Sequence, residues 1–287
     1  MPTQRQRLLL LVPLGLVLLP FLVWPSAFGF LASFTDYGPT QLHVHFVGLA
    51  NYLAVARDPQ LGIAFRNIAV FTLVAVPTEL ATGFVVAYLL REPFRSRTML
   101  RVMLLVPWLV SPIASGVMWH YLFDGQIGLL NYWLGWLGLP DQPSPLGLRH
   151  LALLATIMTD VWRKSPLASF LLLPGLLSIP PEAWEQATLE GATVLGRVRH
   201  VALPGVRPLL LTVALLLVGD ALGTFDSVLI LTGGGPGSAT ITPGLYSYQW
   251  AFQINAWPLG ATSTWLIVAS VLLIGLVYLR LVRTEAQ

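Results

Sequence analysis

Long apolar runs separated by short polar segments dominate this sequence. Six of the runs are long enough to cross a lipid bilayer, because a spanning helix needs about 20 residues for about 30 Å of hydrocarbon. They lie near residues 8–33, 67–90, 101–123, 151–178, 209–231 and 259–282. The pattern therefore predicts an all-α membrane protein with six transmembrane helices.

Prolines lie inside two of these runs. Pro107 and Pro112 are in the third run, and Pro166 and Pro174 are in the fourth. Proline removes a backbone donor and clashes with the preceding turn of a helix. A spanning helix tolerates this where neighbouring groups or water in a cavity satisfy the freed carbonyls. We expect both helices to be broken at these prolines.

Basic residues are concentrated in alternate loops. They cluster at Arg5, Arg7, Arg91, Arg95, Arg97, Arg101, Arg197, Arg199, Arg207, Arg280 and Arg283, whereas the intervening loops hold few or none. Because cytoplasmic loops are enriched in Lys and Arg, we expect both chain ends and the polar segment 179–208 to lie in the cytoplasm. The first run is longer than the apolar core of a secretory signal, so we expect it to be retained as a helix.

Composition excludes several classes of protein. The chain is 55% hydrophobic and 10% charged, with a mean hydropathy of +0.73, which lies outside the range of soluble domains. The basic residues form no continuous stripe, so we expect no nucleic-acid partner. The absence of cysteine rules out disulfides and thiol chemistry in this chain. His43 and His45 have no carboxylate or thiol at ligand spacing, and we expect no metal site.

The polar segment 179–208 predicts a helical hairpin. Pro181 suits the first position of a helix, and Glu185 follows in the opening turns, where the helix dipole favours negative charge. Gly191 is placed to turn the chain. A second short helix with several basic residues then runs back to Pro204. We expect a compact knob with an acidic first half and a basic second half.

The spacing Glu185-x-Ala187, Glu190-Gly191-Ala192 and Leu203-Pro204 resembles the cytoplasmic "EAA" loop of ABC importer permeases, which docks on the ATPase subunit. The resemblance implies a type I permease fold with a coupling helix, and residues 1–287 as a single transmembrane permease domain. The ATPase-coupling residues that it implies are Glu185, Ala187, Glu190, Gly191, Ala192, Leu203 and Pro204.

Nucleotide chemistry is not expected in this chain. Its one glycine cluster, residues 233–237, is followed by neither a Lys-Ser nor a Lys-Thr pair, so it cannot cradle phosphates as a P-loop does. The resemblance implies that the chain carries no cofactor and that a separate ATPase binds ATP and Mg. The histidines form no nucleophile–base set, which argues against a membrane enzyme.

Several further features are similar to carbohydrate importers of the maltose, trehalose and glycerol-phosphate type. They are the glycine cluster with its proline, the pair Trp162 and Pro166, and the pair Phe225 and Asp226. The resemblance implies a sugar substrate, and alternating access by rocking of two permeases around a midplane site. The substrate-pathway residues that it implies are Trp162, Arg163, Lys164, Asp220 and Thr224.

Charged residues inside the runs admit two interpretations. A charge at membrane depth costs at least about 2.5 kcal/mol on the mildest scale, so such residues mark a pathway or a buried pair. Asp160 and Lys164 are four residues apart and can pair on one helix face. The competing class is a proton-coupled secondary transporter, in which Glu79, Asp160 or Asp220 carries the proton. That alternative gives the hairpin around Glu185 no purpose.

The resemblance also implies partners and a location. The expected partners are a second, homologous permease subunit, two ATPase subunits, an extracytoplasmic substrate-binding protein, membrane lipid and the sugar. The expected location is the cytoplasmic membrane of a bacterium or archaeon, with several spans. The sequence leaves open which sugar is carried and whether this subunit contacts it.

Overall fold

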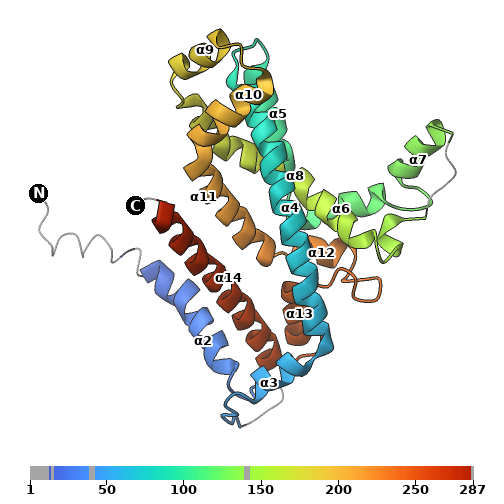
Figure 1. Cartoon of the computed structure of the whole chain (residues 1–287). Helices are drawn as coiled ribbons and strands as arrows, with labels where there is room; N and C mark the ends of the chain where they lie inside the picture. The colour runs from blue at the N-terminus through green and yellow to red at the C-terminus, as the bar shows by residue number, and fades with distance from the viewer. Residues whose placement is uncertain (1–12, 14–15, 39–42, 139–142, 286–287) are drawn as a thin grey trace, which may run out of the picture. The chain divides into compact units, whose positions relative to one another are not determined.

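The computed structural model describes residues 13, 16–38, 43–138 and 143–285 (Figure 1). Every regular element among them is a helix, and a single isolated antiparallel bridge joins Thr35 to Phe46. The all-α prediction is therefore confirmed. The start of the first predicted span lies outside the described residues.

The chain divides into two compact units, Met1–Gly62 with Tyr246–Ser270 and Ile63–Leu245 with Val271–Gln287. The single-domain organisation stays a prediction. In the first unit, the π-helical turn η1 (Leu19–Val23) leads into α2 (Trp24–Ala32), and α3 (Ala50–Arg57) follows. The unit is fastened by polar contacts, among them the Tyr246 hydroxyl, which donates to Asp58 Oδ2 over 2.6 Å.

The second unit contains most of the helices. Their bounds are α4 (Pro59–Arg91), α5 (Arg97–Leu109), α6 (Pro112–Leu122), α7 (Leu129–Trp136), η2 (Pro145–Gly147), α8 (Ala152–Leu177), α9 (Pro181–Leu189), α10 (Val194–Arg197), η3 (Val198–Ala202), α11 (Leu203–Leu222) and α12 (Asp226–Leu231). The remaining helices, shared with or belonging to the first unit, are α13 (Pro243–Tyr248), η4 (Gln249–Gln253) and α14 (Trp257–Glu285).

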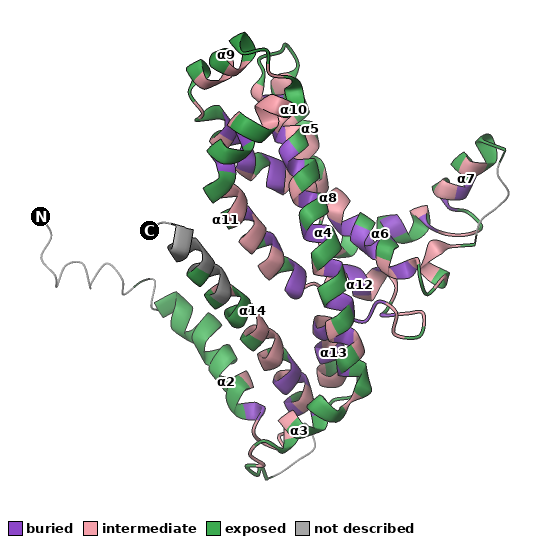
Figure 2. Ribbon diagram, in the orientation of Figure 1, coloured by how far each residue is buried: buried purple, intermediate pink, exposed green. Residues whose placement is uncertain are grey.

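A buried apolar cluster joins α4, α8 and α11. Phe71, Leu172 and Leu217 lie in it at 0–2% exposure. Figure 2 shows buried residues along α8 and largely exposed ones over α9. The helices meet closely, because a Cβ atom added at Gly83 of α4 would lie 2.6 Å from Ala168 Cβ of α8. This core holds the polar groups described below.

Within the described residues, three helices are long and apolar enough to cross a membrane: Pro59–Arg91, Val194–Leu222 and Trp257–Leu276. Two bent pairs, α5 with α6 and α8 with α9, raise the number to as many as five among the described residues, by length and composition. The segment Leu16–Ala32 is a shorter apolar helix. The count of six spans stays a prediction.

The prolines act differently in the two predicted breaks. The third span is bent by 92° between α5 and α6, directly before Pro112, where the Ser111 hydroxyl accepts from the Ala114 amide over 3.2 Å. Pro107 lies inside α5. The break predicted at Pro166 and Pro174 is wrong, since α8 continues through both. Packing of α8 in the core holds the helix together despite the lost donors.

Candidate functional site

The hairpin after α8 begins as the sequence predicts. α9 starts at Pro181 and carries Glu182 in its first turn. Gly191 has a φ of +75°, and a Cβ atom added there would meet nothing within 4 Å. The backbone conformation, rather than lack of space, therefore requires glycine at this turn. The Thr193 hydroxyl caps α10 by accepting from the Gly196 amide over 3.2 Å.

The second half of the hairpin differs from the prediction. A short helix ending at Pro204 was expected, but one helix runs from Val194 to Leu222. The π-helical turn η3 comes directly before α11, and Pro204 occupies one of the first positions of α11. The changed hydrogen-bond register of a π turn lets the helix pass this proline.

The two halves of the hairpin enclose a hollow of about 400 Å³. Its lining residues are Ile179, Ala183, Gln186, Ala187, Glu190, Ala192, Gly196, His200 and Val201. Of the seven predicted coupling residues, Ala187, Glu190 and Ala192 therefore lie on it. The Gln186 amide donates to Glu190 Oε1 over 3.0 Å, which fixes that carboxylate.

The other predicted coupling residues, Glu185, Gly191, Leu203 and Pro204, are exposed and do not line the hollow. Two exposed apolar side chains that the sequence pattern did not predict as coupling residues belong to the same hairpin. Leu189 is 88% exposed and Leu195 is 75% exposed. Leucines at these positions of an otherwise polar hairpin are the signal that could have found them.

Inside the second unit, charged side chains from three helices come together. Lys164 Nζ lies 2.7 Å from Asp160 Oδ2 and 2.5 Å from Asp220 Oδ2, and Arg163 Nη2 lies 3.2 Å from Asp160 Oδ1. The predicted pair of Asp160 and Lys164 is therefore present. Both of these side chains are almost fully buried, whereas Asp220 is 61% exposed.

Glu79 of α4 belongs to the same group of charges. It is fully buried, and neither of its carboxylate oxygens makes a hydrogen bond within the described residues. Its carboxyl interacts electrostatically with Asp160, Lys164 and Asp220. We call Glu79, Asp160, Arg163, Lys164 and Asp220 the charge cluster. It joins α4, α8 and α11.

Three of the five predicted pathway residues line one small polar cavity of about 80 Å³. These are Arg163, Asp220 and Thr224, and the remaining lining residues are Pro112, Gly223, Phe225, Asp226 and Ser227. The cavity lies where the helix is interrupted over residues 223–225, between α11 and α12. Carboxylates, a guanidinium and hydroxyls can all hydrogen-bond to a hydroxylated ligand.

The other two predicted pathway residues lie elsewhere. Lys164 is held by the two aspartates and is 2% exposed. Trp162 packs edge-on against Trp119, with ring centroids 5.7 Å apart, and joins the small apolar cluster around Phe123 and Leu231. Trp162 therefore packs on the α6 side of α8, and its role in the pathway stays a prediction.

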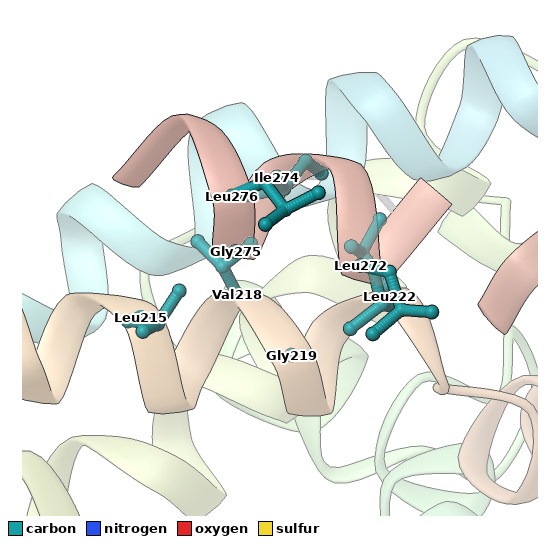
Figure 3. Close-up of a pocket in the computed structure, with 9 residues that line it drawn as sticks. Leu215, Val218, Gly219, Leu222, Leu272, Ile274, Gly275 and Leu276 are labelled. Carbon is teal, nitrogen blue, oxygen red and sulfur yellow. The ribbon is translucent and has the colours of Figure 1, made fainter. Parts of the chain in front are cut away.

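A larger groove of about 380 Å³ lies between α11 and α14 (Figure 3). It is lined by aliphatic residues and two glycines, among them Leu215, Leu222 and Leu272. It offers no side-chain hydrogen-bond donor or acceptor, so its chemistry does not suit a sugar.

No group of three or more His, Cys, Asp or Glu side chains able to hold a metal ion occurs in the described part of the chain. His45 Nδ1 instead lies 3.0 Å from Asp36 Oδ2. The His45 amide also donates to Asp36 Oδ1 over 2.7 Å, which lowers the pKa of that carboxyl.

Long apolar helices, buried ion pairs within them and an exposed polar hairpin define a class, the membrane-spanning subunits of transport systems. The chain belongs to the family of binding-protein-dependent transport system inner membrane components, which matches residues 79–284. It is therefore a transport subunit and not an enzyme. The predicted membership of the importer permeases is therefore confirmed, while the coupling roles of the hairpin residues stay a prediction.

Several characterised proteins are similar over nearly the whole chain. The trehalose/maltose transport system permease protein MalF of Thermococcus litoralis is 33% identical, over 96% of this chain and 92% of that protein. The sulfoquinovosyl glycerol transport system permease protein SmoG of Agrobacterium fabrum is 30% identical, over 96% and 90%. A chain of a bacterial ABC transporter that imports alginate has the same fold, with a TM-score of 0.85, 19% identity and coverage of 99% and 98%.

Proposed function

We propose that this chain is a permease subunit of an ATP-driven importer for a sugar. The observation that carries the proposal is the meeting of Arg163, Asp220 and Thr224 on one polar cavity between membrane helices. Vicinal hydroxyls of a sugar are suitable partners for a guanidinium and a carboxylate. The names of the relatives, one for trehalose and maltose and one for a sulfonated sugar glycerol, support the same substrate class.

The hairpin α9–α10 is the proposed docking surface for an ATPase subunit. Glu185 offers a carboxylate to a basic partner, while Leu189 and Leu195 offer apolar area around it. Ala187, Ala192 and the glycine turn keep the hollow open to an inserted segment. ATP and Mg are bound by the ATPase, and this chain supplies only the surface that receives the movement.

The small size of the cavity supports an assembly with several subunits. The cavity of about 80 Å³ is too small to enclose a whole sugar. A second, related permease completes the pathway, two ATPases serve the two hairpins, and a binding protein delivers the sugar from outside. Both chain ends and the hairpin lie in the cytoplasm, as the basic loops indicate.

One observation favours a second candidate, a proton-coupled secondary transporter. Glu79 is a fully buried carboxylate without a hydrogen bond among the described residues, and buried carboxylates carry protons in such transporters. The exposed hairpin gives this candidate no support.

Reconstituted proteoliposomes distinguish the two candidates. The chain is purified with its partner permease, the ATPase and the binding protein, and uptake of radiolabelled trehalose and maltose is measured. Importer function predicts uptake that needs ATP inside the vesicle and the binding protein outside. Uptake driven by a proton gradient without ATP would overturn the proposal in favour of the secondary transporter.

A further inference from the structure

An arginine at the end of α4 packs against a tryptophan of the hairpin helix α9. Arg91 is the last residue of α4, and its side chain is only 10% exposed. The guanidinium carbon lies 3.5 Å from the ring centroid of Trp184 in α9 and 4.5 Å from that of Tyr88 in α4. Cation–π contacts are strongest when the cation is removed from water, as it is here.

The Arg91 guanidinium contacts two aromatic rings but forms few hydrogen bonds. Arg91 Nε and Nη1 are buried and make no hydrogen bond to the described residues, while Nη2 donates to Glu92 over 2.6 Å. Tyr88 also meets Trp184 edge-on, at 6.1 Å between centroids. The contact therefore depends on the planar guanidinium and on the indole face, not on charge alone.

The contact between Arg91 and Trp184 connects the hairpin, through α4, with the charge cluster. Behind Tyr88, the ring of Phe84 stacks at 6.3 Å between centroids and is buried in the core. Gly83 lies against Ala168 of α8, and the Thr82 and Ser165 hydroxyls are 2.6 Å apart. Glu79 lies on the same helix, about 18 Å from Arg91 at a rise of about 1.5 Å per residue.

We infer that Arg91 is a positioning residue that locks α9 onto the end of α4, so that a displacement of the hairpin moves α4 and reaches the charge cluster. This inference rests on the proposed docking of the hairpin to an ATPase. Without Arg91, α9 keeps its contacts with α10 and η3 and the apolar packing of Trp184 against the core, so a displacement of α9 reaches α4 less directly.

Spin labels test the contact between α4 and α9 directly, because the chain has no cysteine of its own. One label is placed on α9 at Glu182→Cys and one on α4 at Leu89→Cys, both exposed positions. The complete complex, built with cysteine-free partner subunits, is measured without nucleotide and with ATP and vanadate. We expect one narrow distance distribution that is the same in both states.

The Arg91→Ala variant should broaden this distribution at least twofold, and Trp184→Leu should do the same. The double variant should be no worse than either single variant, because both remove one contact. Arg91→Lys, which keeps the charge but loses the planar group, should be intermediate. Arg95→Ala, in the exposed loop that follows, is the matched control and should leave the distances unchanged.

A narrow, unchanged distribution in Arg91→Ala would overturn the inference, as would additive effects in the double variant. If Arg91→Ala fails to assemble, Arg91→Lys and Trp184→Phe decide in the same way. The measurement needs no sugar. Failure of wild-type uptake of trehalose and maltose would therefore count against the proposed function. The distances between the spin labels would still test the contact between Arg91 and Trp184. With uptake present, we expect the Arg91→Ala complex to transport at least tenfold less sugar per ATP hydrolysed.

Discussion

Lys164 of α8 forms an ion pair with Asp220 of α11 across 2.5 Å, at the edge of the polar cavity. The two partners have opposite surroundings, because Lys164 is 2% exposed and Asp220 is 61% exposed. The lysine is therefore a fixed part of the core, whereas the aspartate is available to a ligand. This asymmetry separates the structural charges of the cluster from those proposed for the pathway.

Removing the buried lysine should destabilise the protein. Lys164→Met leaves Asp160 buried with Arg163 as its one remaining partner in the charge cluster. Leaving a buried charge with no partner costs about 3–5 kcal/mol, and the pair with Arg163 keeps the loss of stability below that figure. We expect a clearly lower melting temperature of the purified complex. The double variant Asp160→Asn with Lys164→Met should recover most of the loss, while Arg95→Met should have no effect. A double variant as unstable as Lys164→Met would contradict the pairing.

Changes at the cavity should instead alter transport. Asp220→Asn is expected to leave the melting temperature close to wild type, since the side chain is largely exposed. A carboxylate accepts hydrogen bonds from sugar hydroxyls more strongly than an amide does, and a hydrogen bond to a charged group contributes about 1.5–3 kcal/mol, so uptake of the transported sugar should fall by about tenfold or more. Arg163→Gln should act in the same direction. Normal uptake and unchanged selectivity in both variants would remove these residues from the site.

The parts of the site that depend on near neighbours in sequence could be predicted, and those that depend on packing could not. The backbone preference of Pro181 indicates the start of the hairpin, and that of Gly191 indicates its turn. Asp160 and Lys164 meet because they are four residues apart in a helix. In contrast, Asp220 meets Lys164, and Arg91 meets Trp184, only because the fold brings distant parts of the sequence together.

The prolines of α8 also show that packing decides what the local sequence does not. Pro166 removes a backbone donor, which locally favours a break. The helix nevertheless continues, because Ala168 and Leu172 beside it are fully buried against neighbouring helices. Local preference is overridden where enough apolar contact surrounds it. Similarly, nothing in the sequence around Trp162 indicated that its ring would pack against Trp119.

The close approach of α4 and α8 should be sensitive to a single methyl group. Gly83→Ala would place its Cβ atom 2.6 Å from Ala168 Cβ and 2.9 Å from the Ser169 amide nitrogen, so the helices must separate. Overpacking of this kind costs about 1–3 kcal/mol. Gly62→Ala in the same helix meets nothing within 4 Å and is the control. Its melting temperature should match or exceed wild type, while that of Gly83→Ala should fall.

The orientation can be read with single cysteines. Ser238→Cys adds a thiol of nearly the same size in the loop after α12, and Arg95→Cys adds one between α4 and α5. In intact cells, a membrane-impermeant maleimide should label Cys at position 238 and spare position 95. Permeabilised cells should label both, which confirms that each thiol is accessible. Labelling in the reverse order would invert the topology and move the hairpin to the outer side.

Glu185 should be required for the ATPase to respond, and not for the protein to fold. Its side chain is exposed on α9, so Glu185→Lys reverses the charge of the docking surface with little effect on the core. We expect normal membrane insertion and complex yield, but loss of the ATP hydrolysis that loaded binding protein stimulates. Glu182→Lys, at another exposed glutamate one turn earlier, loses only a favourable interaction with the helix dipole of about 1 kcal/mol or less. It should retain most of the stimulation. Wild-type stimulation in the Glu185→Lys complex would show that the hairpin does not use this carboxylate.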